Sequence, residues 1–131
     1  MDSQPLVMVV DDDPDLLFLI TEELADAGYR IQEATNGREA LDAMDSQAPD
    51  AIVSDVMMPD MDGVDLYWAV QDKPDLRDVP FIFLTALRPG MGDARLLDCS
   101  RALRSPKPID FDELIRQLST LTDTADRRQA R

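Results

Sequence analysis

Acidic and other polar residues follow the apolar segments of this chain, at the points where predicted strands end. Asp11 and Asp12 come after the run LVMVV, Asp55 after AIVS, Thr85 after FIFL, and Lys107 shortly after ALRS. Carboxylates that crowd together repel one another unless a cation joins them, and Mg²⁺ prefers hard oxygen ligands. A lysine beside such a metal suits a transferring phosphoryl group, whose oxygens bridge both cations. The pattern therefore predicts phosphoryl transfer, with Asp55 as the nucleophile that forms an acyl phosphate.

The segments that would position these residues alternate between strand and helix patterns. Apolar or alternating runs predict strands, which lie at Leu6–Val10, Tyr29–Ala34, Ala51–Ser54, Val79–Leu84 and, weakly, Arg101–Ser105. Helical spacing of apolar residues predicts five helices. The first begins at Pro14 and stops near Gly28, and the others run from Asn36 to Met44, from Val64 to Val70, weakly from Asp93 to Cys99, and from Ile109 to Leu121. Strict alternation predicts an α/β fold, a five-stranded parallel sheet covered by helices on both faces. All the strands would then end at one edge of the sheet.

The length and composition suit one globular domain. The chain has 131 residues, 44% of them hydrophobic, and we expect the domain to cover residues 1–121, with 122–131 as a polar tail or the start of a linker. No apolar run is long enough to span a bilayer, and the N-terminus lacks a signal-peptide pattern. The single cysteine, Cys99, suits a reducing compartment. A cytoplasmic protein without a membrane partner is expected.

The negative charge of the chain is unevenly distributed. Residues 1–86 hold 20 Asp or Glu and 4 Lys or Arg, whereas residues 87–131 hold 7 and 9. An acidic domain repels the phosphate backbone, so no direct nucleic-acid partner is expected. The mildly basic last third is predicted to dock a downstream protein or a second copy of the chain through residues 95–121.

The motifs and their spacing resemble the receiver domain of two-component response regulators over residues 5 to about 121. The marks are the acidic pair in VVDDDP, Asp55 in SDVMMPDMDG, Thr85 in FLTA and Lys107 in KP. Asp55 follows Asp12 by 43 residues and precedes Thr85 by 30 and Lys107 by 52. The resemblance implies the flavodoxin-like (βα)5 fold, with a weak fourth helix and fifth strand in this chain.

The same resemblance implies a role for each residue of the site. Asp12 and Asp55 would bind Mg²⁺ directly, Asp11 mostly through water, and the backbone carbonyl of Met57 would complete the protein ligands. Asp55 would accept phosphate from the phosphohistidine of a sensor histidine kinase or a phosphotransfer protein. Thr85 and Lys107 would hold the phosphoryl oxygens, and the peptide after Lys107 is expected to be cis. Such a domain is a signalling switch that changes partner binding, and not an enzyme in the usual sense.

Two other functions stay open on the residues alone. Asp11-x-Asp13 after a strand is similar to haloacid-dehalogenase-type phosphatases, which would make the chain a small Mg²⁺-dependent phosphohydrolase. That family has Thr or Val where this chain has Asp15. The other alternative is a receiver-like interaction module that works without phosphorylation.

The aromatic switch residue of the family, three positions before the lysine, is Arg104 in this chain. A guanidinium stays charged at physiological pH, and burying it unpaired is strongly unfavourable. Arg104 is therefore predicted to stay outside the space behind Thr85 and to act, if at all, at an interface. Asp13 is predicted to cap the first helix.

Overall fold

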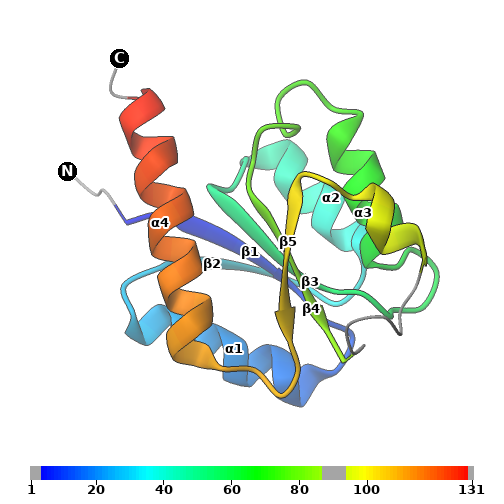
Figure 1. The fold of residues 1–131 in the computed structure, drawn as a ribbon, viewed down its shortest axis with the longest axis horizontal. Coiled ribbons are helices and arrows are strands. Elements are labelled where there is room, and N and C mark those ends of the chain that lie inside the picture. The colour runs from blue at the N-terminus through cyan, green and yellow to red at the C-terminus, as the bar shows by residue number, and fades with distance from the viewer. Residues whose placement is uncertain (1–3, 87–93, 130–131) are drawn as a thin grey trace.

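Strands and helices alternate along the chain (Figure 1), and the structure, a computed structural model, describes residues 4–86 and 94–129, with side chains through residue 122. The elements in chain order are β1 (Leu6–Val10), α1 (Pro14–Asp26), β2 (Arg30–Ala34), α2 (Gly37–Ser46), β3 (Ala51–Asp55), α3 (Gly63–Gln71), β4 (Phe81–Thr85), the 3₁₀-helix η1 (Ala94–Asp98), β5 (Ala102–Pro106) and α4 (Phe111–Gln129). The predicted strands are all present.

The five strands form one parallel sheet in the order β2-β1-β3-β4-β5. The register places Val10 opposite Ser54 of β3, and Asp55 opposite Leu84 of β4. The strand ends that carry the predicted site residues therefore lie at the same edge of the sheet. This confirms the predicted α/β fold with a five-stranded parallel sheet.

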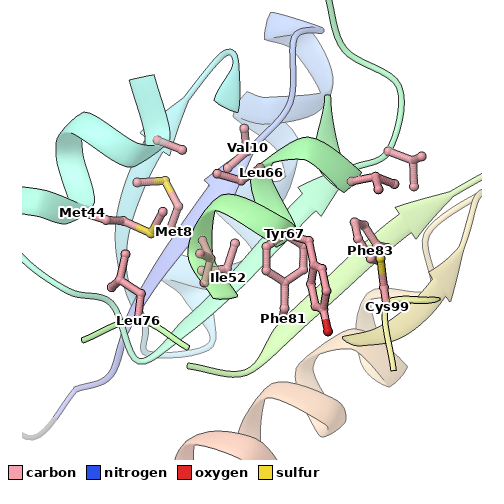
Figure 2. Close-up of a cluster of buried hydrophobic side chains, with 14 of the residues drawn as sticks. Met8, Val10, Met44, Ile52, Leu66, Tyr67, Leu76, Phe81, Phe83 and Cys99 are labelled. Atoms are coloured by element: carbon pink, nitrogen blue, oxygen red, sulfur yellow. The ribbon is translucent and has the colours of Figure 1, made fainter. Parts of the chain in front are cut away.

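Helices cover both faces of the sheet, and each face has its own apolar cluster. The α2–α3 cluster joins side chains of α2, α3 and η1 to one face, among them Met44, Tyr67 and Phe83 (Figure 2). The second cluster joins α1 and α4 to the other face through residues such as Ile20 and Leu114. Every residue of β1 and β4 is buried. These strands are apolar along nearly their whole length because helices pack on both of their sides.

Asparagine and aspartate residues fix the starts of three helices. The Asp13 carboxylate accepts hydrogen bonds from the amides of the two residues after Pro14, which confirms the predicted cap of α1. Asn36 caps α2 in the same way. Asp62 caps α3 and forms a reciprocal capping box with Asp65. These side chains satisfy amides that have no partner inside the helix.

Two segments differ from the sequence-based expectation. The weak fourth helix is the short 3₁₀-helix η1, while Asp93, its predicted start, lies outside the described residues. The prediction that the last helix ends at Leu121 is wrong, because α4 continues to Gln129. Thr122 is buried, and its hydroxyl donates to the Leu118 carbonyl, so a polar residue extends the inner face of the helix. In the part of the chain that the structure describes, no helix is both long and apolar enough to cross a membrane.

Candidate functional site

Three carboxylates predicted from the sequence meet at the carboxyl edge of the sheet. Asp11 and Asp12 follow β1, Asp55 ends β3, and a carboxylate oxygen from each lies within 4.8 Å of the other two. Asp11 is buried, Asp12 is exposed and Asp55 is largely covered. The cluster is therefore exposed to solvent at Asp12, and a ligand can approach it from there.

Asp11 is the most enclosed of the three carboxylates. Its Oδ1 accepts a hydrogen bond of 2.9 Å from the Asp13 amide, whereas its Oδ2 is buried and has no hydrogen-bond partner in the described structure. Burial raises the pKa of Asp11 to about 6, the Asp13 amide lowers it, and the negative charge of Asp55 raises it. A buried carboxylate oxygen without a donor is costly, and a cation held between the carboxylates would satisfy it. The donor set, hard oxygens only, fits Mg²⁺.

Lys107 supplies the positive charge of the site. Its Nζ lies 3.2 Å from Oδ1 of Asp55, and its side chain is 23% exposed. The Lys107 amide donates to the Thr85 carbonyl over 2.8 Å, which joins the ends of β4 and β5. The peptide between Lys107 and Pro108 is cis, as expected. The ammonium group is thus placed beside the carboxylate that we expect to be modified.

Thr85 lies on the strand next to Asp55. It is the last residue of β4 and is buried at 6% exposure, one position beyond Leu84, the register partner of Asp55. Met57 follows the end of β3 by two residues, and its side chain is exposed. The structure therefore brings the carboxylates and Lys107 together directly, with Thr85 at the end of the adjacent strand.

The loop from β3 to α3 packs tightly against the site. A Cβ atom at Gly63 would overlap the carbonyl oxygen of Asp55, and the Gly63 amide donates to the Val56 carbonyl over 2.9 Å. Asp60, in the same loop, has a positive φ of 64°. The sequence indicated a turn here, but not that the first residue of α3 must be glycine to let the helix approach Asp55.

An ion pair that was not predicted joins this loop to η1. Nη2 of Arg95 lies 2.8 Å from Oδ2 of Asp62, and Nη1 lies 3.8 Å from Oδ1 of Asp65. Burial raises the pKa of Asp62, but the Asp65 amide and Arg95 lower it, and the net pKa lies below its usual value. Arg95 and Asp62 are 33 residues apart in the chain. No local pattern in the sequence predicts a contact over that separation.

Comparison with known proteins identifies relatives of this site and its fold. The family model of the response regulator receiver domain matches residues 7–119. An uncharacterized 14.6 kDa protein of Leptolyngbya boryana is 41% identical over 120 residues, which cover 87% of each chain. The response regulator MprA of Mycolicibacterium vanbaalenii is 36% identical over 115 residues, covering 88% of this chain and 49% of that protein. The chain spans about half the length of the MprA regulators that it matches.

Solved structures with the same fold include receiver domains of kinases. A receiver domain of a signal transduction histidine kinase from Syntrophus aciditrophicus has a TM-score of 0.83 and 32% identity, over 92% of this chain and 91% of that one. The receiver domain of the sensor histidine kinase PA1611 from Pseudomonas aeruginosa has a TM-score of 0.84 and 28% identity, over 92% and 99%. That second structure holds a magnesium ion coordinated in its active-site cleft.

Proposed function

Since this chain belongs to the response regulator receiver family, we propose that it is a phosphorylation-controlled switch that accepts a phosphoryl group on Asp55. The single observation that carries the proposal is the placement of Asp55 next to both the carboxylates of Asp11 and Asp12 and the ammonium group of Lys107. The carboxylates suit a metal and the ammonium group suits an anion, so a phosphoryl group on Asp55 would have a cation on each side.

The residues present fit Mg²⁺, and Asp11, Asp12, Asp55 and the Met57 carbonyl would hold it. The buried Oδ2 of Asp11, which has no donor among the described residues, supports this assignment. Bound there, the ion would neutralise charge on the phosphoryl oxygens. Asp11 is the most buried of the three carboxylates, and it would bind the ion mostly through water.

The transfer step that we propose forms one bond and breaks one. A carboxylate oxygen of Asp55 attacks phosphorus, the P–N bond of the donor phosphohistidine breaks, and the imidazole leaves with the electron pair and takes up a proton. Lys107 and the hydroxyl of Thr85 would hold the equatorial oxygens and keep attacking and leaving atoms in line. The chain itself has no histidine. The donor is therefore a separate group, which we assign to a sensor histidine kinase or a phosphotransfer protein.

Two features of the site weigh against the alternative functions. A phosphohydrolase would use Asp13 as an acid–base group, but its carboxylate is turned to the amides at the start of α1. An interaction module that works without phosphorylation would need no cation at the site, and the cost of the buried Asp11 oxygen would then stay uncompensated. We therefore propose a signalling domain that carries out its own phosphoryl transfer and loss and turns over no separate substrate.

The partner surface that we propose is the 95–121 region. Leu97 on η1 is 75% exposed and Leu103 on β5 is 43% exposed, and Arg104, the residue after Leu103, is exposed as well. Apolar groups beside positive charge suit an acidic downstream protein or a second copy of this acidic chain. The overall negative charge disfavours nucleic acid. We propose that these partners are met in the cytoplasm.

Intact-mass spectrometry with a small phosphodonor and Mg²⁺ tests the assignment of Asp55. The wild type is expected to gain one phosphate equivalent, because the cations on both sides of Asp55 stabilise the transferring group. Asp55→Asn is expected to gain none. Asp42→Asn, which removes an exposed carboxylate of α2, is the matched control and should be modified like the wild type.

Two outcomes would contradict the proposal. Uptake of one phosphate by Asp55→Asn would place the phosphoacceptor elsewhere. Repeated hydrolysis of a generic phosphate ester by the wild type, many times per molecule, would favour the phosphohydrolase.

A further inference from the structure

Arg104, at the position of the aromatic switch residue of the family, reaches the short helix η1 with its guanidinium group. Its guanidinium Nη2 donates a hydrogen bond of 3.0 Å to the backbone carbonyl of Leu96 in η1. Arg104 is exposed, whereas Leu96 is buried in the α2–α3 cluster. The charged head thus ties β5 to η1 at the surface, instead of entering the interior behind Thr85.

Arg95 ties the same short segment to the loop that carries the site. Its guanidinium contacts Asp62 at 2.8 Å and Asp65 at 3.8 Å, at the start of α3. Asp62 is the cap of α3, and its side chain is only 16% exposed. A charge-assisted hydrogen bond to a largely covered carboxylate is stronger than an exposed ion pair.

The start of α3 is in turn in close contact with Asp55. Gly63 packs so tightly that even a Cβ atom would overlap the Asp55 carbonyl, and its amide donates to Val56. Packed backbone of this kind is not compressible, so a shift of Asp55 shifts the first turn of α3 and its cap, Asp62. A continuous line of contacts therefore runs from Asp55 through Asp62 and Arg95 to η1, and through Arg104 to β5.

We propose that Arg95 and Arg104 couple the site at Asp55 to the β5 edge by holding η1 between α3 and β5. The inference rests on the proposed phosphorylation of Asp55, and it names a route of regulation for that site. Coupling along a line of contacts requires energetic evidence and not only proximity. The chain contains a natural probe for that evidence.

The probe is Cys99, the residue directly after η1 and the only cysteine of the chain. It is buried in the α2–α3 cluster (Figure 2), and its Sγ lies 3.5 Å from the carbonyl oxygen of Arg95. A thiol reagent reaches a buried cysteine only when the covering segment opens locally. The rate of Cys99 modification therefore measures how firmly η1 is held.

The first arm of the experiment measures this rate with a water-soluble aromatic disulfide and no phosphate analogue. Arg95→Ala is expected to raise the rate about three-fold, the size of effect that follows from losing one partly exposed ion pair. Arg104→Ala should act in the same direction. Arg101→Ala is the matched control, because Arg101 lies two residues from Cys99 but its guanidinium contacts Arg77 and Asp78 instead. Its rate should equal that of the wild type.

The second arm repeats the measurement with Mg²⁺ and beryllofluoride, and fluorine NMR reports binding of the analogue independently. The Cys99 rate of the wild type and of Arg101→Ala is expected to change on loading, and Arg95→Ala should lose most of that change. Linkage is reciprocal, so if loading changes the strength of the contact between Arg95 and Asp62, the loss of that contact in Arg95→Ala should change the affinity for beryllofluoride. Asp62→Asn serves as a second variant. Asparagine caps helices as well as aspartate, so this variant keeps the fold while it weakens the ion pair.

The outcomes separate this inference from the function on which it rests. If Arg95→Ala and Asp62→Asn have the same Cys99 modification rate as Arg101→Ala in the first arm, the contact between Arg95 and Asp62 does not hold η1 and the inference is overturned. If the two variants differ from Arg101→Ala in the first arm but their Cys99 rates still change on beryllofluoride binding as much as that of the wild type, the coupling is overturned. If the wild type binds no beryllofluoride, the proposed function fails and the coupling fails with it, while the first arm still decides whether the ties exist.

Discussion

At the scale of single residues, Asp11 shows how the fold places a functional group at a cost. Its carboxylate is fully buried, one of its oxygens has no donor in the part of the chain that the structure describes, and two other carboxylates lie nearby. Burial raises its pKa to about 6, against an ordinary value of 3.8. The folded chain therefore holds a proton at Asp11 more tightly than the unfolded chain does. Without metal, the stability associated with that proton is present below pH ~4 and is lost as the pH rises to about 6.

The raised pKa of Asp11 gives a prediction for the stability of Asp11→Asn in the absence of metal. At pH 7 the variant is expected to be more stable than the wild type by roughly 1–2 kcal/mol, because no charge remains to be buried. Below pH ~4 the difference should vanish, since Asp11 of the wild type is then neutral in both states. Urea unfolding at several pH values, with a chelator present, measures the effect.

The control for Asp11→Asn is Asp12→Asn, which removes an exposed carboxylate of the same cluster. Its effect on stability at pH 7 should be smaller. Added Mg²⁺ should reverse the order and favour the wild type, because only the wild type keeps the full ligand set. A destabilised Asp11→Asn at pH 7 without metal would show that burial does not dominate the energetics of this residue.

At the scale of elements, the starts of α2 and α3 show how closely helices can approach the strand ends. Both begin with a glycine, and a Cβ atom on either would meet a neighbour. At Gly63 that neighbour is the backbone of Asp55 and Val56, whereas at Gly37 it is the flexible side chain of Met61. A side chain can turn away, but the end of a central strand cannot move without disturbing its ladder.

The two glycines therefore form a matched pair for a test. Gly63→Ala is expected to lower the free energy of unfolding by about 2–3 kcal/mol, the cost of overpacking against backbone, and to weaken Mg²⁺ binding by displacing Asp55. Gly37→Ala should cost less than about 1 kcal/mol and leave Mg²⁺ binding unchanged, because Met61 can adopt another rotamer. Chemical unfolding and a metal titration measure both quantities. Equal losses in the two variants would refute the distinction between backbone and side-chain neighbours.

Elements also differ in how well the sequence alone predicts them. The buried strands β1, β3 and β4 were predictable, because strands covered on both faces are apolar along most of their length. The polar residues at their ends marked where the proposed site would lie. The last helix was predicted to stop at Leu121, because the residues after it are polar, yet α4 continues to Gln129. The contacts of Arg95 with Asp62 and of Arg104 with Leu96 were not predictable, since they depend on where η1 lies relative to α3 and β5.

At the scale of the whole molecule, exposed apolar side chains lie towards both ends of the strand order. Phe18, 66% exposed, lies on α1, which packs against β1 and β2. Leu97 and Leu103 lie on η1 and β5, at the opposite end of the strand order. Arg95 of η1 and Arg104 of β5 add positive charge at that second end. The two apolar surfaces are therefore far enough apart to be tested separately.

Self-association provides the test for the proposed surface. In sedimentation velocity with Mg²⁺ and beryllofluoride, the wild type is expected to form more dimer than the unloaded chain. Leu97→Asp should abolish this gain, because it places a charge in the apolar contact, and Arg104→Ala should reduce it. Phe18→Asp is the matched control and should dimerise normally. A chain that stays monomeric throughout would exclude a second copy as the partner, and loss of dimer in Phe18→Asp alone would move the surface to α1.

The double role of Asp62 has a consequence for how this protein can vary. Its carboxylate serves α3 as a cap and Arg95 as an ion partner, whereas the Arg95 guanidinium is not part of the cap of α3. A substitution of Arg95 alone would therefore remove the ion pair and leave the cap of α3 in place, whereas a residue at position 62 that cannot cap would also cost α3 about 1 kcal/mol. The link between η1 and the site can thus change while the start of α3 keeps its cap. Differences in signalling between descendants of this chain can accumulate at Arg95 without endangering the domain that carries them.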